Sequence, residues 1–154
     1  MPIIRARRTG FFSADYRLSR DEADLGVLDL APVRSRARFT IDGVAHSIEP
    51  EGLLSGRFAL IADGRAIAHA ERERLLPLWY RVRAGDRQLM LRESLPGRRF
   101  AILHGDRQVG EIRPVRLLTR NAVATYDAPL APATEIFLLT LVLLRWRQRM
   151  RSSG

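Results

Sequence analysis

The segment from Ile136 to Leu144, close to the C-terminus, is apolar on every side of a helical wheel. Pro132 suits the first position of such a helix, because the N–H that proline lacks is not needed there. Glu135 falls in the first turn and arginines crowd the last turn, so the charges at both ends complement the helix dipole. A helix that is apolar all round lies inside a protein or inside a membrane. We therefore expect one helix, about residues 132–149, that is covered on all its faces.

The length of the apolar run distinguishes these two surroundings. From Leu130 to Leu144 it has fifteen residues, and Pro132 and Glu135 interrupt it. At about 1.5 Å per residue it spans roughly 22 Å, less than the roughly 30 Å of hydrocarbon that a transmembrane helix crosses. A tail-anchored membrane protein stays an alternative, because arginines at the helix end can extend its reach by snorkelling. A helix enclosed by the chain's own strands is the preferred interpretation.

Pairs of glycine and aspartate punctuate the middle of the chain between short β-prone runs. They are Asp42-Gly43, Asp63-Gly64, Gly85-Asp86 and Gly105-Asp106. Asp-Gly favours a hairpin because both central residues of a type I′ turn need a positive φ. The flanking runs alternate: Tyr80 and Val82 face one side of their strand, and the neighbouring arginines face the other. The chain therefore reads as a succession of antiparallel hairpins.

One of these hairpins is repeated in the sequence. The segment from Arg57 to Ala68 aligns with the segment from Arg99 to Gly110 at a constant offset of 42 residues. A shorter segment, Arg38 to Ala45, shows the same opening Arg-Phe and the same turn. Two copies in register and a third trace favour real structural repetition over chance similarity between hairpins.

Further strands are expected at Gly10 to Leu18, Gly26 to Leu30 and Asn121 to Tyr126, with a short helical turn at Glu71 to Leu76. About ten to twelve strands result, at the spacing typical of barrels and sandwiches. A helix with its side chains is about 10–12 Å wide, so enclosing it takes more than the roughly eight strands of a barrel filled by side chains alone. The predicted fold class is mainly β: an antiparallel hairpin-repeat barrel around the C-terminal helix, forming a single domain over residues 1–154.

A meander of repeated hairpins around an apolar C-terminal helix resembles the tubby C-terminal-like superfamily, which includes LURP-one-related proteins and phospholipid scramblases. The residues that carry the resemblance are Phe58 to Ala68, their copy at Phe100 to Gly110, and Thr134 to Trp146. The segment Gly105 to Ile112 is similar to that family's late hairpin. The resemblance implies a small, bacterial-type, tubby-like β-barrel, and membrane-lipid association as in some members. The basic strand residues of phosphoinositide-binding members and the acidic calcium segment of scramblases have no counterpart here.

Arginine supplies all 26 basic residues of the chain, and the net charge is +9. The net charge invites a polyanionic partner, either an anionic membrane lipid or nucleic acid. The absence of lysine weighs against nucleic acid, because nucleic-acid-binding proteins usually combine lysine and arginine. Near a charged membrane each arginine contributes about 1 kcal/mol of attraction. Trp146 fits an aromatic anchor at a bilayer surface or, as we prefer, a plug for the mouth of the barrel. The candidate ligand-binding residues for an anionic partner are Arg145, Trp146, Arg147, Arg149 and Arg151.

No catalytic motif stands out in the sequence. The chain has no cysteine, which excludes disulfides, thiolate nucleophiles and cysteine-ligated metals. Its three histidines, His46, His69 and His104, fall at unequal positions of the repeat, so neither a metal site nor a cofactor is expected. The motifs of the serine nucleophile elbow and of phosphate-binding glycine loops are missing.

We therefore expect a non-enzymatic protein that binds anionic lipid surfaces or an apolar ligand. A nucleic-acid-binding β-barrel is the alternative. The residues from Met1 to Arg8 carry charges without the apolar stretch of a secretory signal, which favours the cytoplasm, with attachment at the periphery of a membrane as a further expectation.

Overall fold

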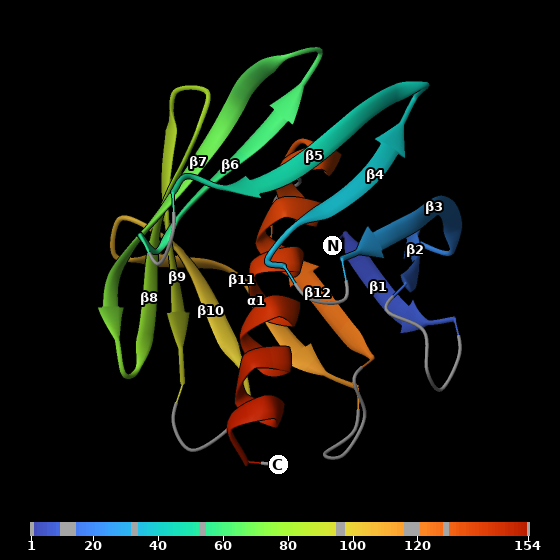
Figure 1. Cartoon of the computed structure of the whole chain (residues 1–154). Coiled ribbons are helices and arrows are strands. Elements are labelled where there is room, and N and C mark those ends of the chain that lie inside the picture. Colours follow the sequence, from blue (N-terminus) through green and yellow to red (C-terminus); the bar gives the residue numbers. More distant parts are fainter. Residues whose placement is uncertain are drawn as a thin grey trace.

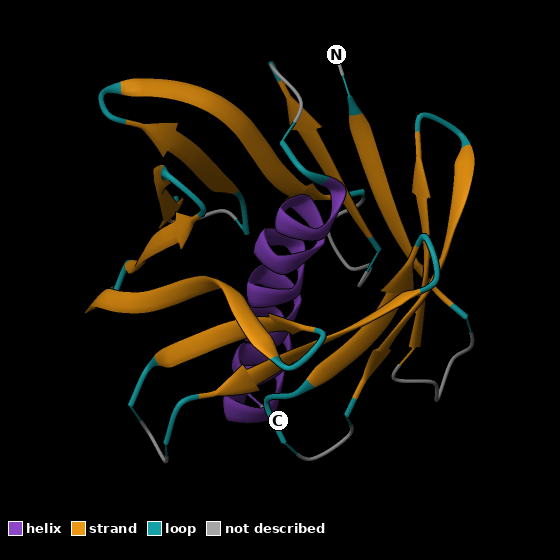
Figure 2. Ribbon diagram, turned by 90° about the horizontal axis from the view of Figure 1, so that it is seen from above, coloured by secondary structure: helices purple, strands orange, loops and turns teal. Residues whose placement is uncertain are grey.

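The structure is a computed structural model that describes residues 2–9, 15–31, 34–52, 55–94, 98–115, 121–127 and 130–153. Within them the chain forms a closed antiparallel barrel of twelve strands, in which neighbours in sequence pair and β1 closes on β12. A single helix, α1 (Pro132–Ser153), runs through the barrel (Figures 1 and 2). The strands are β1 (Ile3–Arg8), β2 (Asp15–Arg20), β3 (Ala23–Leu30), β4 (Ala37–Ile41), β5 (Val44–Pro50), β6 (Arg57–Ala62), β7 (Arg65–Leu75), β8 (Leu78–Ala84), β9 (Arg87–Glu93), β10 (Phe100–His104), β11 (Arg107–Pro114) and β12 (Ala122–Tyr126). The predicted fold class is confirmed.

The strands enclose α1 on all sides, as the view from above shows (Figure 2). From Ile136 to Leu143 no side chain of the helix is more than 1% exposed. The strands supply the other half of this core through alternate residues: on β8, Tyr80 and Val82 are buried while Arg81 is exposed. No helix among the described residues is long and apolar enough to cross a membrane. The apolar segment is therefore the core of the barrel, and α1 continues slightly beyond its expected end near residue 149.

The barrel consists of three copies of a four-stranded unit: β1–β4, β5–β8 and β9–β12. In each unit one extra residue bulges out of the ladder between the second and third strand. These bulged residues, Leu25, Ile67 and Val109, are 42 positions apart. The residues Tyr16, Phe58 and Phe100 follow the same spacing and are all buried. The repeat between residues 57–68 and 99–110 is thus confirmed, and its first copy is the hairpin β2–β3.

Two sequence expectations need correction. The segment Arg38 to Ala45 forms a hairpin, but it joins the first unit to the second and is not a copy of the 42-residue repeat. The segment Glu71 to Leu76 is not a helical turn, since β7 continues to Leu75 and pairs with β8 down to Leu78. Pairing with a neighbouring strand outweighs the local helix propensity of such a short charged run. The part of the expected first strand at residues 10–14 lies outside the described residues.

The glycine and aspartate pairs form two kinds of tight turn. In Asp42-Gly43 and Asp63-Gly64 both residues have a positive φ, 51° for each aspartate and 77° and 74° for the glycines, as a type I′ turn requires. In Gly85-Asp86 and Gly105-Asp106 only the glycine has a positive φ, 62° and 64°, which fits a type II′ turn. The predicted turn positions are confirmed, and the order of the two residues selects the turn type.

Gly110 lies where two strands and a core tyrosine approach closely. A Cβ built there is 2.8 Å from the Thr125 carbonyl oxygen and 3.0 Å from the Tyr126 ring. Because the carbonyl belongs to the neighbouring strand's backbone, Gly110→Ala is expected to lower the free energy of unfolding by about 1–3 kcal/mol. Urea denaturation measures this change. Ala68, at the equivalent position of the second unit, is the control: Ala68→Gly is expected to cost no more than about 1 kcal/mol, and equal losses at both sites would contradict the steric explanation.

Candidate functional site at the loop end of the barrel

The two ends of the barrel are built differently. At one end, which we call the turn end, two-residue turns join the strands and α1 begins. At the opposite end, which we call the loop end, α1 finishes where β1, β3, β5, β7, β9 and β11 end (Figure 1). Hydrogen bonds from Arg145 to Leu75, from Trp146 to Arg98 and from Arg147 to Arg34 fix the end of the helix there.

Charge is distributed unequally between the two ends. The turn end carries exposed acidic residues, partly offset by Arg65, Arg87 and Arg107, which directly follow three of the turns. These acidic residues are Asp21, Glu22, Asp42, Asp63, Asp86, Asp106 and Asp127. The loop end carries exposed arginines, partly offset by Glu51, Glu71 and Glu73. These arginines are Arg34, Arg36, Arg57, Arg74, Arg92 and Arg99. A basic protein therefore has one end, the turn end, where acidic groups prevail.

Two of the C-terminal arginines singled out by the sequence are bound to a buried carboxylate, Glu93, whose side chain is 2% exposed. Arg145 donates to the Glu93 carboxylate at 3.3 Å and to the Leu75 carbonyl at 3.1 Å. Arg149 donates to the same carboxylate at 2.8 Å, and the Leu78 backbone N–H does so at 3.1 Å. Glu93 thus ties the end of α1 to the barrel wall.

Trp146 and Arg147 are also engaged within the chain. Trp146 is 3% exposed, its indole N–H donates to the Arg98 carbonyl at 3.0 Å, and the Arg98 guanidinium lies 4.6 Å from the ring centre. Arg147 donates to the carbonyls of Ala31 and Arg34. Trp146 therefore fills the mouth of the barrel, whereas the Arg151 side chain lies outside the described part. Binding of an anionic partner by this C-terminal group stays a prediction.

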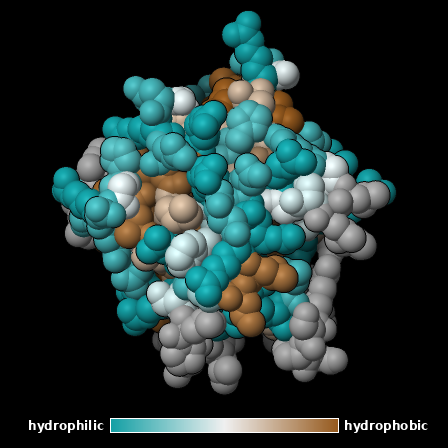
Figure 3. Space-filling view, turned by 90° about the vertical axis from the view of Figure 1, so that its left-hand side faces the viewer, coloured by the Kyte–Doolittle hydropathy of each residue, from teal (hydrophilic) through white to brown (hydrophobic). Residues whose placement is uncertain are grey.

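A set of exposed apolar side chains at the loop end was not predicted from the sequence. Leu75 is 54% exposed, Leu76 66%, Val115 45% and Met150 43%, and only two other large apolar side chains of the described residues are comparably exposed. Figure 3 shows the side formed by β7–β10, where hydrophobic patches, one of them toward the lower end, interrupt a hydrophilic surface. The sequence Leu75-Leu76-Pro77 could have indicated this exposure, because the proline ends the strand next to two leucines. Neither leucine is buried in the structure.

An aromatic residue with two arginines borders this apolar set. The Trp79 ring, at the start of β8, has the Arg92 guanidinium 4.1 Å and the Arg74 guanidinium 5.2 Å from its centre. Both arginines are exposed on the outer wall, and Arg74 directly precedes Leu75. Cation–π contacts hold these guanidinium groups beside the exposed leucines. We call Leu75, Leu76, Val115 and Met150, with the bordering Arg74, Arg92 and Trp79, the loop-end surface.

A different electrostatic feature lies at the turn end, where α1 begins. The Glu135 side chain has no exposed surface, and the Arg20 guanidinium is 3.1 Å from its carboxylate. Burial raises the pKa of Glu135 to about 7, although the charge of Arg20 acts in the opposite direction. The Tyr126 hydroxyl donates to the Glu135 backbone carbonyl at 3.4 Å. This carboxyl is part of the core and does not face the loop-end surface.

The histidines do not form a metal centre with other ligands. His46 is buried on β5, His69 is exposed on β7 and bound to Glu51 at 2.8 Å, and His104 is exposed at the end of β10. In the described part of the chain, no cluster of three histidine, aspartate or glutamate side chains is arranged to hold a metal ion. No family model matches this sequence, and no curated protein or solved structure matches the chain.

Proposed function

We propose that this protein is a non-enzymatic binding protein that attaches to anionic lipid membranes through the loop-end surface. The observation that carries the proposal is the exposure of four large apolar side chains at the end of the barrel where exposed arginines prevail. Apolar side chains enter the boundary between headgroups and acyl chains, and arginines attract anionic headgroups. The acidic turn end favours the orientation in which the loop end faces the membrane.

The expected strength of membrane attachment is the sum of the apolar contribution of the leucines and the electrostatic contribution of the arginines. Fully burying a leucine side chain contributes about 1.5–3 kcal/mol, so Leu75 and Leu76, which are 54% and 66% exposed, are each expected to supply roughly half of that. Each arginine close to an anionic surface adds about 1 kcal/mol. Neither contribution gives stable binding alone, so binding is expected to require both the leucines and anionic lipid.

The proposed membership of the tubby C-terminal-like superfamily is compatible with this function. A closed barrel around a C-terminal helix is the architecture that the resemblance implies. In this proposal the C-terminal arginines support the loop-end surface from within. By binding Glu93, Arg145 and Arg149 hold the strand ends that display Leu75 and Leu76.

Vesicle co-sedimentation tests the proposal. The protein is mixed with vesicles of phosphatidylcholine alone or of equal parts phosphatidylcholine and phosphatidylserine, at low and high salt. Binding is expected only with phosphatidylserine and is expected to weaken as salt rises. Replacing Leu75 and Leu76 together by serine is expected to lower the partition constant about tenfold or more, because the apolar contribution is lost.

Ile67→Ser provides the matched control, because Ile67 is 42% exposed but lies near the turn end of β7. Its partition constant is expected to equal that of the unmodified protein. Equal binding to both vesicle types, or an equal loss in the Ile67 and leucine variants, would argue against membrane attachment at this end. Salt-sensitive binding to duplex DNA, without binding to either vesicle, would favour the nucleic-acid alternative.

A further inference from the structure

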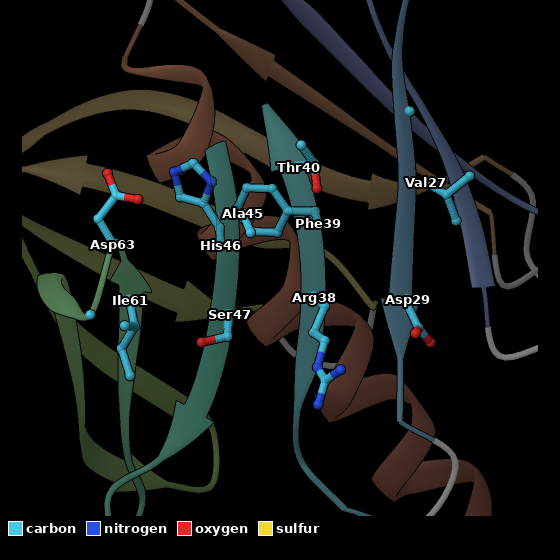
Figure 4. Close-up of a pocket in the computed structure, with 12 residues that line it drawn as sticks. Val27, Asp29, Arg38, Phe39, Thr40, Ala45, His46, Ser47, Ile61 and Asp63 are labelled. Atoms are coloured by element: carbon cyan, nitrogen blue, oxygen red, sulfur yellow. The ribbon is translucent and has the colours of Figure 1, made fainter. Parts of the chain in front are cut away.

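A cavity of about 740 Å³ opens in the barrel wall between β3 and the hairpin β4–β5. Small-molecule sites typically have volumes of about 300–1,000 Å³, with apolar walls and a few polar groups. The apolar side chains of this wall are Val27, Phe39, Ala45 and Ile61, and the polar ones are Asp29, Arg38, Thr40, His46, Ser47 and Asp63. Figure 4 shows these side chains with α1 behind them. The cavity lies away from the loop-end surface.

The cavity occurs where the first unit departs from the threefold repeat. In the second and third units the corresponding strands pair along most of their length, from Ala68↔Ala84 in β7–β8, with one bulge at Glu73, and from Gly110↔Tyr126 in β11–β12. In the first unit β3 and β4 pair only through Asp29↔Arg38 and Leu30↔Ala37. Beyond this point β4 rises away from β3 (Figure 1).

The unpaired stretch leaves backbone groups at the cavity. Continuing the β3–β4 register by two residues would pair Val27 with Thr40, but both line the cavity instead. The other two units show that this chain can close the same junction. Backbone donors and acceptors on both edges of the opening are available to hydrogen-bond a molecule that enters it.

A buried histidine faces this opening. His46 is 8% exposed, and its ring stacks on Phe39 with ring centres 4.8 Å apart and planes 8° apart. Its Nδ1 lies 2.9 Å from the Val44 carbonyl oxygen. A carbonyl only accepts, so Nδ1 carries the proton in this contact and the neutral ring keeps its lone pair on Nε2. Since His46 lines the cavity, Nε2 is the acceptor offered to a ligand.

The charges around the cavity favour a cation. Asp29 and Arg38 are register partners on neighbouring strands, and they contribute one charge of each sign to the lining. The remaining charge of the lining is Asp63, which directly follows Ala62, the register partner of His46. In Figure 4 the imidazole of His46 lies between Asp63 and Phe39. A carboxylate, an imidazole acceptor and an aromatic ring together suit a group that donates hydrogen bonds and carries positive charge.

We propose that this cavity binds a small organic amine, with its ammonium group between His46 and Asp63 and its apolar body against Phe39 and Ile61. This site is independent of the membrane attachment proposed above. The ammonium donates hydrogen bonds to Nε2 of His46 and to the Asp63 carboxylate. The apolar body displaces water from the part of the cavity wall beside Phe39.

Titration of the ¹⁵N-labelled protein with phenethylamine, followed by amide chemical shifts, tests the proposal. The neutral 2-phenylethanol and the anionic 3-phenylpropionate serve as matched probes of similar size. Phenethylamine is expected to shift the amides of Phe39, His46 and Asp63 saturably, and to bind about tenfold tighter than the alcohol. The carboxylate is expected to bind most weakly.

Asp63→Asn tests the charge, and Asp42→Asn is its control. Both aspartates are exposed, with a φ of 51° in an Asp-Gly turn that asparagine also tolerates, and only Asp63 lines the cavity. Asp63→Asn is expected to weaken phenethylamine binding about tenfold, and Asp42→Asn to leave it unchanged. The proposal is overturned if no saturable shift appears in the millimolar range, if the acid binds as tightly as the amine, or if the two variants behave alike.

Discussion

Replacing Glu93 by alanine is expected to lower the free energy of unfolding by about 3–5 kcal/mol, the usual cost of removing one partner of a buried ion pair. The Glu93 carboxylate accepts hydrogen bonds from Arg145, Arg149 and the Leu78 backbone N–H. Arg145 is itself only 9% exposed, so its guanidinium would be left buried without a carboxylate. Urea denaturation followed by far-UV circular dichroism measures the loss.

Two variants separate the buried network from a general effect of removing a carboxylate. Glu111→Ala breaks an exposed pair with Arg99, whose side chain is 64% exposed, and is expected to cost less than about 1 kcal/mol. Glu93→Gln keeps an acceptor for the Leu78 backbone N–H, and its loss in free energy of unfolding is expected to lie between those of Glu93→Ala and Glu111→Ala. If Glu93→Ala and Glu111→Ala cost the same, the Glu93 network does not hold the end of α1.

The second large effect is a dependence of stability on pH that comes from Glu135. Its pKa in the folded protein is about 7, raised from 4.5 by burial in the core. Between these values the folded state keeps the proton that the unfolded state releases, so stability falls as pH rises through this window. The difference between the two pKa values corresponds to about 3 kcal/mol in the free energy of unfolding. This contribution is fully present below pH 4.5, the pKa of the unfolded state, and is lost above pH 7.

Glu135→Gln removes this titration while keeping the size of the side chain. We expect the stability of the variant, relative to the unmodified protein, to increase by about 3 kcal/mol between pH 4 and pH 8. Chemical denaturation of both proteins across this range measures the difference, and other titrating groups cancel because both proteins share them. A constant difference between the two proteins at all pH values would show that Glu135 does not titrate in this window.

The architecture was predictable because its determinants are local. The segment from Ile136 to Leu144 is apolar all round, too short to span a bilayer, and bounded by proline and arginines, so burial by strands was the preferred interpretation. The glycine and aspartate pairs fixed the hairpin turns, because positive φ restricts the residues that fit. The repeat at residues 57–68 and 99–110 survived in sequence, whereas the first copy, at Asp15 to Gly26, kept only its spacing and its buried aromatic residue.

The partners of individual side chains were not predictable. Glu93 and Arg149 meet only because β9 ends where α1 finishes, and no feature near either residue in the sequence indicates the other. The same reason explains why the C-terminal arginines were singled out for an anionic partner, whereas the structure shows Arg145, Arg147 and Arg149 bound within the chain. Strand pairing also extended β7 to Leu75 and left Leu76 exposed beside Pro77.

The type of fold follows from local sequence: hairpins at defined turns, a repeat of 42 residues, and an apolar helix that the strands must cover. Each of these features depends on the backbone preferences or the polarity of residues that are neighbours in the chain. The pairing of charges, the exposure of particular leucines and the separation of β3 from β4 at the cavity are visible in the folded chain alone. These features depend on strand register and on contacts between distant residues, and a single sequence does not encode them in a local pattern.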